Sequence, residues 1–318
     1  MGKVNITGEE QAFEETVNAT PYPENIAESS DFKESGMSAY EEKDSANAGL
    51  SKEELDDPNN IKVTIDDDSS PIVVLFGPPS CGKTMTLIRL TRYLSQIGFT
   101  VSPVKTFRPS YDQHYKELCD GFNGLVDSDS AALSNTRINF MLLSVFRQGH
   151  PVCQILEAPG EHYYVGHGAA EAFPKYISNI IQNNNRKIWL FMVEPDWKDS
   201  EDRDGYVSRI RKLKSKIDMS DKGIFVFNKV DGTNYVISKG KVNQKEAFKF
   251  VQKQYKGIFE PFRNENPITR FFRKYRCAFV PFSTGTFHEK KAGGLSYEQG
   301  PDAYPRQLWN VIAKSIKG

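Results

Sequence analysis

The chain has 318 residues, of which 38% are hydrophobic and 12% aromatic, and its 41 basic side chains balance 41 acidic ones. That apolar fraction supports a sizeable core, and because no run of 18 apolar residues occurs, we expect no membrane-spanning helix. The four cysteines form no C-x-x-C pair, which argues against a zinc site and favours reduced thiols, so we expect a cytoplasmic protein.

The zero net charge hides two unequal parts. Residues 1–70 hold 18 acidic and 5 basic side chains, a net −13, so the remainder carries +13. Residues 1–60 have few large apolar side chains, which predicts a largely disordered acidic arm. Within it, Ser51 and Glu54 have the spacing of a capping box, which predicts a short helix. We therefore expect an arm over 1–60 and one domain over 61–318.

From about residue 61, short apolar runs alternate with helical stretches. The predicted strands are Pro71–Phe76, Ile138–Phe146, Val152–Leu156, Ile188–Val193, Ile224–Phe227 and Ala278–Phe282. The predicted helices are Lys83–Ile97, Ala169–Gln182, Gly205–Ile217, Gln244–Tyr255 and Arg306–Ile316. The residues RQGHP predict a hairpin between the second and third strands. This alternation predicts an α/β domain whose sheet is mostly parallel, with helices on both faces and one antiparallel edge hairpin.

The first motif follows the first strand and opens the first helix. Its residues match G-x-x-x-x-G-K-[ST], a loop whose backbone N–H groups and helix N-terminus attract phosphate. The lysine of such a loop reaches the β- and γ-phosphates, and the hydroxyl that follows binds Mg²⁺. The candidate residues are Gly77, Ser80, Cys81, Gly82, Lys83 and Thr84.

The second motif is Asn228-Lys229-Val230-Asp231, directly after a predicted buried strand. Here the chain resembles the GTPase superfamily, whose base-recognition motif is N-K-x-D. A carboxylate at Asp231 accepts two hydrogen bonds from guanine, whereas adenine would leave it unpaired, which discriminates by roughly 10⁴-fold. The resemblance implies that Lys229 packs on the base and that Asn228 ties this loop to the phosphate loop.

The third motif, Glu157-Ala158-Pro159-Gly160, is similar to the family's D-x-x-G with glutamate in place of aspartate. The resemblance implies that Glu157 holds Mg²⁺ through water and that the N–H of Gly160 contacts the γ-phosphate. Glu161 stands where Ras-like enzymes usually carry the glutamine that orients water. A carboxylate there would repel the γ-phosphate, so we expect slow intrinsic hydrolysis.

Two further positions complete the resemblance. Thr136 lies 21 residues before Glu157 and is similar to the switch threonine that binds Mg²⁺, with Thr106, Ser110 and Ser134 as competitors. Ser283 and Thr284 follow the last strand, where the family's S-A-K loop contacts guanine, although an ordinary turn would also fit. Arg108 is the candidate for an arginine finger in the chain itself; help from a partner protein is the alternative we prefer.

Residues 232–276 form a basic, aromatic insertion between the last two strands. Such a patch can bind nucleic acid, but a solvated helix face beside core aromatics is the interpretation we favour, and docking of the acidic arm is a third.

From about Ile72 to the end, the chain resembles the Ras-like P-loop GTPases of the translation-factor-related class. A bacterial stand-alone GTPase is one kind of protein that would fit this resemblance. The resemblance implies a three-layer P-loop NTPase fold and a switch that binds GTP or GDP with Mg²⁺, hydrolyses GTP slowly or with a partner, and acts on a protein effector. Two alternatives stay open: a pseudo-GTPase binding module without turnover, and a P-loop ATPase or kinase.

Overall fold

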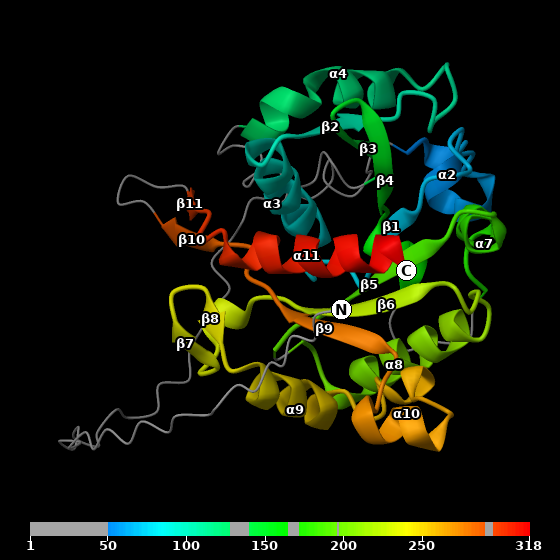
Figure 1. Cartoon of the computed structure of the whole chain (residues 1–318). Coiled ribbons are helices and arrows are strands. Elements are labelled where there is room, and N and C mark those ends of the chain that lie inside the picture. Colours follow the sequence, from blue (N-terminus) through cyan, green and yellow to red (C-terminus); the bar gives the residue numbers. More distant parts are fainter. Residues whose placement is uncertain (1–49, 128–139, 165–171, 196, 290–294) are drawn as a thin grey trace, which may run out of the picture. The chain divides into compact units, whose positions relative to one another are not determined.

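A seven-stranded sheet lies at the centre of the folded domain (Figure 1). The computed structural model describes residues 50–127, 140–164, 172–195, 197–289 and 295–318. The sheet order is β2-β3-β4-β1-β5-β6-β9, in which β3 runs antiparallel to both neighbours and every other pair is parallel. The strands are β1 (Ile72–Phe76), β2 (Phe99–Pro103), β3 (Met141–Arg147), β4 (His150–Glu157), β5 (Lys187–Val193), β6 (Lys222–Phe227) and β9 (Cys277–Pro281). The predicted, mostly parallel sheet is confirmed.

Helices connect and cover these strands. The longer ones are α3 (Lys83–Gln96), α4 (Gln113–Asp127), α7 (Lys175–Gln182), α8 (Ser200–Lys214), α9 (Gln244–Gln254) and α11 (Ala303–Lys317). Short helices and turns are α2 (Lys52–Asp56), η1 (Pro58–Asn60), α6 (Gly160–Tyr163), η3 (Val230–Gly232), η4 (Glu260–Phe262) and α10 (Pro267–Phe272). Two small hairpins, β7 (Val236–Ser238) with β8 (Lys241–Val242) and β10 (Thr286–Glu289) with β11 (Leu295–Glu298), lie outside the main sheet.

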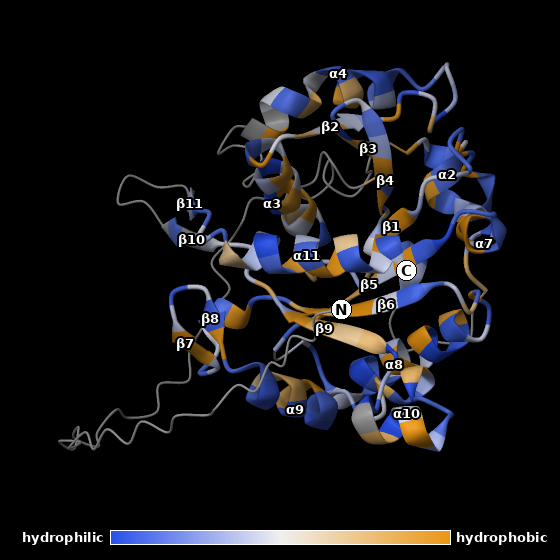
Figure 2. Ribbon diagram, viewed as in Figure 1, coloured by the Kyte–Doolittle hydropathy of each residue, from blue (hydrophilic) through white to orange (hydrophobic). Residues whose placement is uncertain are grey.

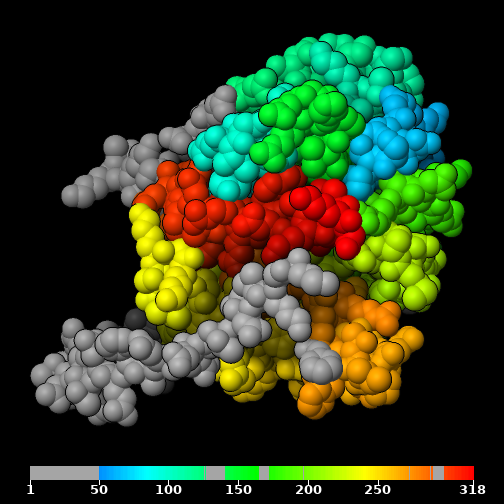
Figure 3. All heavy atoms as spheres, in the orientation of Figure 1, coloured from blue at the N-terminus to red at the C-terminus, as the bar shows by residue number. Residues whose placement is uncertain are grey.

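The apolar runs of the central strands explain this layering. Every residue of β1 and β5 is buried, which requires cover on both faces of the sheet. Helices α3 and α11 pack against each other, and α11 also contacts β5, β6 and β9. In Figure 3 the red atoms of α11 run across the face between the cyan and green residues and the yellow and orange ones.

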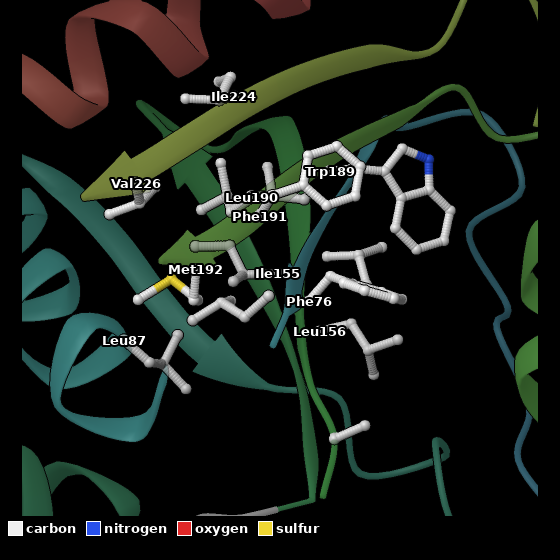
Figure 4. Close-up of a cluster of buried hydrophobic side chains, with 14 of the residues drawn as sticks. Phe76, Leu87, Ile155, Leu156, Trp189, Leu190, Phe191, Met192, Ile224 and Val226 are labelled. Carbon is white, nitrogen blue, oxygen red and sulfur yellow. The ribbon is translucent and has the colours of Figure 1, made fainter. Parts of the chain in front are cut away.

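Aromatic side chains of β1 and α8 pack against each other. The ring of Phe76 lies 6.1 Å from that of Tyr206 on α8, and the Tyr206 hydroxyl donates to the Phe76 carbonyl. Figure 2 shows the central strands in the hydrophobic colour and α8 and α9 with both colours, as amphipathic helices require. Figure 4 shows side chains of the central strands gathered beside Leu87 of α3.

The five predicted helices and six predicted strands are present with shifted ends. Helix α8 begins at Ser200 rather than Gly205, because the Asp199 side chain caps it by accepting the N–H of Asp202. The start of the strand predicted from Ile138 and that of the helix predicted from Ala169 lie outside the described residues, and α7 follows Pro174. The predicted hairpin is β3–β4, but it is not the sheet edge: β2, which was not predicted, pairs with β3 and forms that edge.

Residues 50–60 pack on the domain. The capping box of Ser51 and Glu54 is present, Leu50 is buried in the core, and the Glu54 carboxylate accepts two 2.8 Å hydrogen bonds from Arg108. Residues 1–49 of the predicted arm lie outside the described residues. In the part of the chain that the structure describes, no helix has the length and apolarity needed to cross a membrane.

Candidate functional site

The loop from Gly77 to Thr84 joins the end of β1 to the start of α3. Ser80 and Gly82 have φ angles of 61° and 84°, in the left-handed region that glycine favours. A Cβ on Gly77 would lie 2.6 Å from the Cys81 sulfur, so the tight bend also needs glycine there. No side chain caps α3 at Gly82, so the first N–H groups of the helix remain directed at the loop. This arrangement suits an anion such as phosphate.

Lys83 is held inside this loop. Its side chain is buried, and its ammonium donates to the carbonyls of Gly77 and Pro78 at 3.2 and 3.0 Å. The loop therefore places a cation at its own centre, where a phosphate oxygen would offer a stronger, charge-assisted partner than a carbonyl.

Thr84 and Glu157 meet beside this lysine. The Thr84 hydroxyl donates to Glu157 Oε1 at 2.8 Å, although 73 residues separate them. Burial raises the pKa of Glu157 to about 7, and its second oxygen, Oε2, is buried without a hydrogen-bond partner among the described residues. A hydroxyl and an unsatisfied carboxylate oxygen fit Mg²⁺, which prefers oxygen ligands. No cluster of three or more His, Cys, Asp or Glu side chains occurs in the described ranges, so a Mg²⁺ here would need phosphate and water as further ligands.

The loop after β6 contacts the phosphate loop directly. Asn228 is fully buried, and its Nδ2 donates to the Cys81 carbonyl at 2.9 Å. A Cβ on Gly82 would overlap that same Nδ2, so the two loops are in close contact. The structure thus brings together two motifs that are 147 residues apart.

The remaining side chains of this loop differ in exposure. Lys229 has a φ of 54°, forms an ion pair with Glu194, and reaches the Ser80 carbonyl at 3.5 Å. Asp231 is exposed at the start of η3. Because Asp231 is exposed, its carboxylate is accessible to the base of a nucleotide.

Ser283 and Thr284 lie beside the phosphate loop. Both are buried two and three residues after the end of β9, and the Thr284 methyl group would be 3.3 Å from a Cβ on Gly82. Phosphate loop, Asn228 loop and Ser283 loop therefore meet at the carboxyl ends of β1, β6 and β9, the edge at which open parallel sheets bind ligands.

Gly160 approaches the phosphate loop at Pro78 and Pro79. A Cβ on Gly160 would overlap the backbone nitrogen of Pro79 and lie 2.6 Å from its Cα. Glu161 is exposed on α6, one residue farther on. Thr136 lies outside the described residues, so its predicted role stays a prediction.

Arg108, the candidate arginine finger, is already bound to other residues of the chain. Its guanidinium is buried and binds the carboxylates of Glu54 and Asp112 and the Lys62 carbonyl. It fastens α2 to the domain, so it does not supply an arginine finger. The competitor Thr106 donates to the Asp66 carboxylate.

Two residues of the site were not predicted as functional. His162 is buried, with Nδ1 2.6 Å from the Tyr176 hydroxyl, and burial, with a smaller contribution from Lys83, lowers its pKa to about 4. Glu194 directly follows β5 and is buried beside Lys229. A carboxylate at the carboxyl end of a buried strand was a signal for Glu194; a histidine within an unrecognised turn offered none.

The basic insertion folds against the sheet. Helix α9 buries Ala247 and Val251, while Lys245, Lys249 and Lys253 are exposed. The ring of Phe248 stacks on Phe259 at 4.5 Å, so aromatic side chains of this segment serve the core.

Comparisons with known proteins give distant structural likenesses. No family model matches the sequence, and no curated protein matches it either. A putative nucleolar GTP-binding protein 1 from Plasmodium falciparum is 14% identical, with a TM-score of 0.38, over 80% of this chain and 90% of that one. Translation elongation factor SelB from Methanococcus maripaludis, solved with a GTP analogue, is 11% identical, with a TM-score of 0.35. That match covers 79% of this chain and 34% of SelB.

Proposed function

We propose that this chain binds GTP with Mg²⁺ and acts as a nucleotide-dependent switch. The observation that carries the proposal is the 2.9 Å hydrogen bond from Asn228 to the Cys81 carbonyl. It joins the N-K-x-D loop to the phosphate loop, so that one ligand can contact both. Had the two motifs lain on opposite sides of the domain, no shared ligand would be conceivable.

Each residue then has a defined role. Lys83 exchanges the Gly77 and Pro78 carbonyls for phosphate oxygens, while Thr84 and Glu157 hold Mg²⁺, which neutralises phosphate charge when bound. Asp231 accepts hydrogen bonds from the guanine edge, and Lys229 lies beside the base. Ser283 and Thr284 close the far side of the base pocket.

The switch itself lies where Gly160 meets the phosphate loop. Because Gly160 packs against Pro78 and Pro79, a γ-phosphate bound at this loop would reposition the turn at Gly160, and Thr136 is the candidate switch threonine. Glu161 is the candidate for positioning water, and its negative charge near a γ-phosphate supports slow hydrolysis. A partner protein would supply the stabilising cation, because Arg108 is already engaged.

Competition between nucleotides tests the proposal. Mg²⁺ and a fluorescent GDP analogue are added to the full chain, and GTP, GDP and ATP are titrated as competitors. We expect both guanine nucleotides to displace the probe at concentrations at least 100-fold below ATP. Asp231→Asn should remove most of this preference, and Lys83→Ala should abolish binding. Preference for ATP would overturn the base-reading argument and favour the ATPase or kinase alternative.

Single-turnover hydrolysis separates a switch from a pseudo-GTPase. GTP is loaded in stoichiometric amount, and phosphate release is followed for hours with and without Glu161→Gln. Replacing the carboxylate by the neutral amide should raise the rate, because repulsion of the γ-phosphate is removed. No turnover by either protein would favour the binding module without hydrolysis.

A further inference from the structure

The small hairpin of β10 and β11 holds the loop that closes the base pocket. The Tyr297 hydroxyl on β11 donates to the Thr284 carbonyl at 2.7 Å. A Cβ on Gly285, whose φ is 100°, would lie 2.6 Å from both the Glu298 carbonyl oxygen and the Tyr297 ring. The hairpin strand therefore packs directly against the loop, and only glycine permits that approach.

The phosphate-loop helix holds the same loop from the other side. Arg89 on α3 is fully buried, and its guanidinium donates to the Ser283 carbonyl and, at 3.0 Å, to the Pro301 carbonyl. One turn farther along, the Arg92 guanidinium lies 6.0 Å from the centre of the Tyr297 ring. Helix α3, which begins at Lys83, thus connects the phosphate end of the site to the base end.

These two bonds fix the direction of the peptide groups. In a trans peptide the C=O and the following N–H point in opposite directions within one plane. Because Arg89 fixes the Ser283 carbonyl, it also fixes the N–H of Thr284, and Tyr297 does the same for the N–H of Gly285. The Gly285 N–H is directed to the Ser283 hydroxyl at 3.1 Å. Neither the Ser283–Thr284 nor the Thr284–Gly285 peptide group can rotate without breaking one of these contacts.

We propose that Arg89 and Tyr297 form a clamp that sets the rate at which guanine nucleotide leaves the site. The inference rests on the proposed function and assigns its base loop two positioning residues. The clamp contacts the loop rather than the ligand, so it governs how long the closed loop persists.

Tyr297→Phe is the sharpest test, because it removes one hydroxyl and keeps the ring beneath Arg92. The full chain is loaded with fluorescent GDP, excess GDP is added, and the decay of fluorescence gives the dissociation rate. We expect that rate to rise about fivefold to tenfold, the effect of one hydrogen bond. Arg89→Lys, which cannot reach both carbonyls, should increase it further.

Tyr275→Phe is the matched control. Its hydroxyl donates to Glu260 at 3.0 Å and accepts from Gln252 at 3.3 Å near the other end of β9, and its loss should leave nucleotide release unchanged. Thermal unfolding of each nucleotide-free variant separates an effect of the clamp on release from a general loss of stability: Tyr275→Phe should lose at least as much stability as Tyr297→Phe. If wild type binds the probe and Tyr297→Phe releases it at the wild-type rate, the clamp is refuted and the proposed function stands. If wild type binds no guanine nucleotide, both are refuted.

Discussion

Replacing Gly160 by alanine tests the contact between the turn after β4 and the phosphate loop. The added Cβ would overlap the Pro79 nitrogen and the Pro78 carbonyl carbon and lie 2.6 Å from the Pro79 Cα, whereas ordinary contacts begin at 3.4 Å. All three neighbours are backbone atoms, and proline rings cannot rotate aside. The turn and the loop must therefore separate by about 1 Å, at a cost of roughly 1–3 kcal/mol.

The backbone at Gly160 does not itself disfavour alanine, since this residue begins the short helix α6. The predicted loss of 1–3 kcal/mol therefore reports the contact alone. Urea unfolding of the nucleotide-free chain, followed by circular dichroism, measures it. Gly121→Ala is the control: that glycine lies inside α4 with nothing within 4 Å of its Cβ position. It should stabilise the chain by about 0.5–1 kcal/mol.

Equal stability of Gly160→Ala and wild type would refute the packing of the turn on the loop. A second measurement concerns the proposed switch. Because the N–H of Gly160 is expected to contact the γ-phosphate, the substitution should weaken GTP binding at least tenfold more than GDP binding. Equal weakening of both nucleotides would place Gly160 outside the switch and leave its structural role intact.

Three further predictions concern stability and reactivity. Glu54→Gln should destabilise the chain by about 2 kcal/mol, because it leaves the buried Arg108 with one carboxylate; Glu53→Gln, at an exposed site, should change urea stability by less than about 0.5 kcal/mol, and equal effects would contradict this. His162 has a pKa of about 4, below the ordinary 6.5. Its contribution to the free energy of unfolding is therefore complete above pH 6.5 and is lost as pH falls towards 4. Wild type should therefore lose about 2 kcal/mol more than His162→Gln between pH 8 and pH 5, and parallel pH profiles would refute the assignment. The Cys81 thiol should resist iodoacetamide at pH 7.5 until urea is added, since burial raises its pKa to about 11; an adduct on Cys81 in the native chain would contradict the buried loop.

Much of the domain follows from sequence patterns. β1 is apolar throughout, and β5 and β6 are apolar after their first lysine, which predicts strands buried on both faces. Since those strands are parallel, the motifs that follow them lie at one edge of the sheet, as the meeting of Asn228 and Cys81 shows. Proximity across 147 residues could therefore be anticipated without coordinates.

Other features left weak signals. Strand β2 buries only Val101, because it is the sheet edge, so its sequence lacks the apolar run of an inner strand. Helix α4 carries a regular apolar stripe, but Gly121 and Gly124 within it disfavour helix by about 1 kcal/mol each and obscure the pattern. Arg89 is a charge on a buried helix face, and its partners come from loops about 200 residues away. Side-chain pairing at that separation has no local pattern.

Other parts of the chain already contact the phosphate loop at two places where a phosphate would bind. Ligand binding therefore requires these parts to move. Lys83 occupies the carbonyls of Gly77 and Pro78, and Gly160 occupies the space beside Pro79. Asn228, by contrast, binds the Cys81 carbonyl and can keep that bond with a ligand present. On the proposed function, a nucleotide therefore displaces contacts near the phosphates while the base side stays fixed. The rearrangement at Gly160 then depends on the γ-phosphate. GTP and GDP therefore stabilise different positions of this turn, as a switch requires.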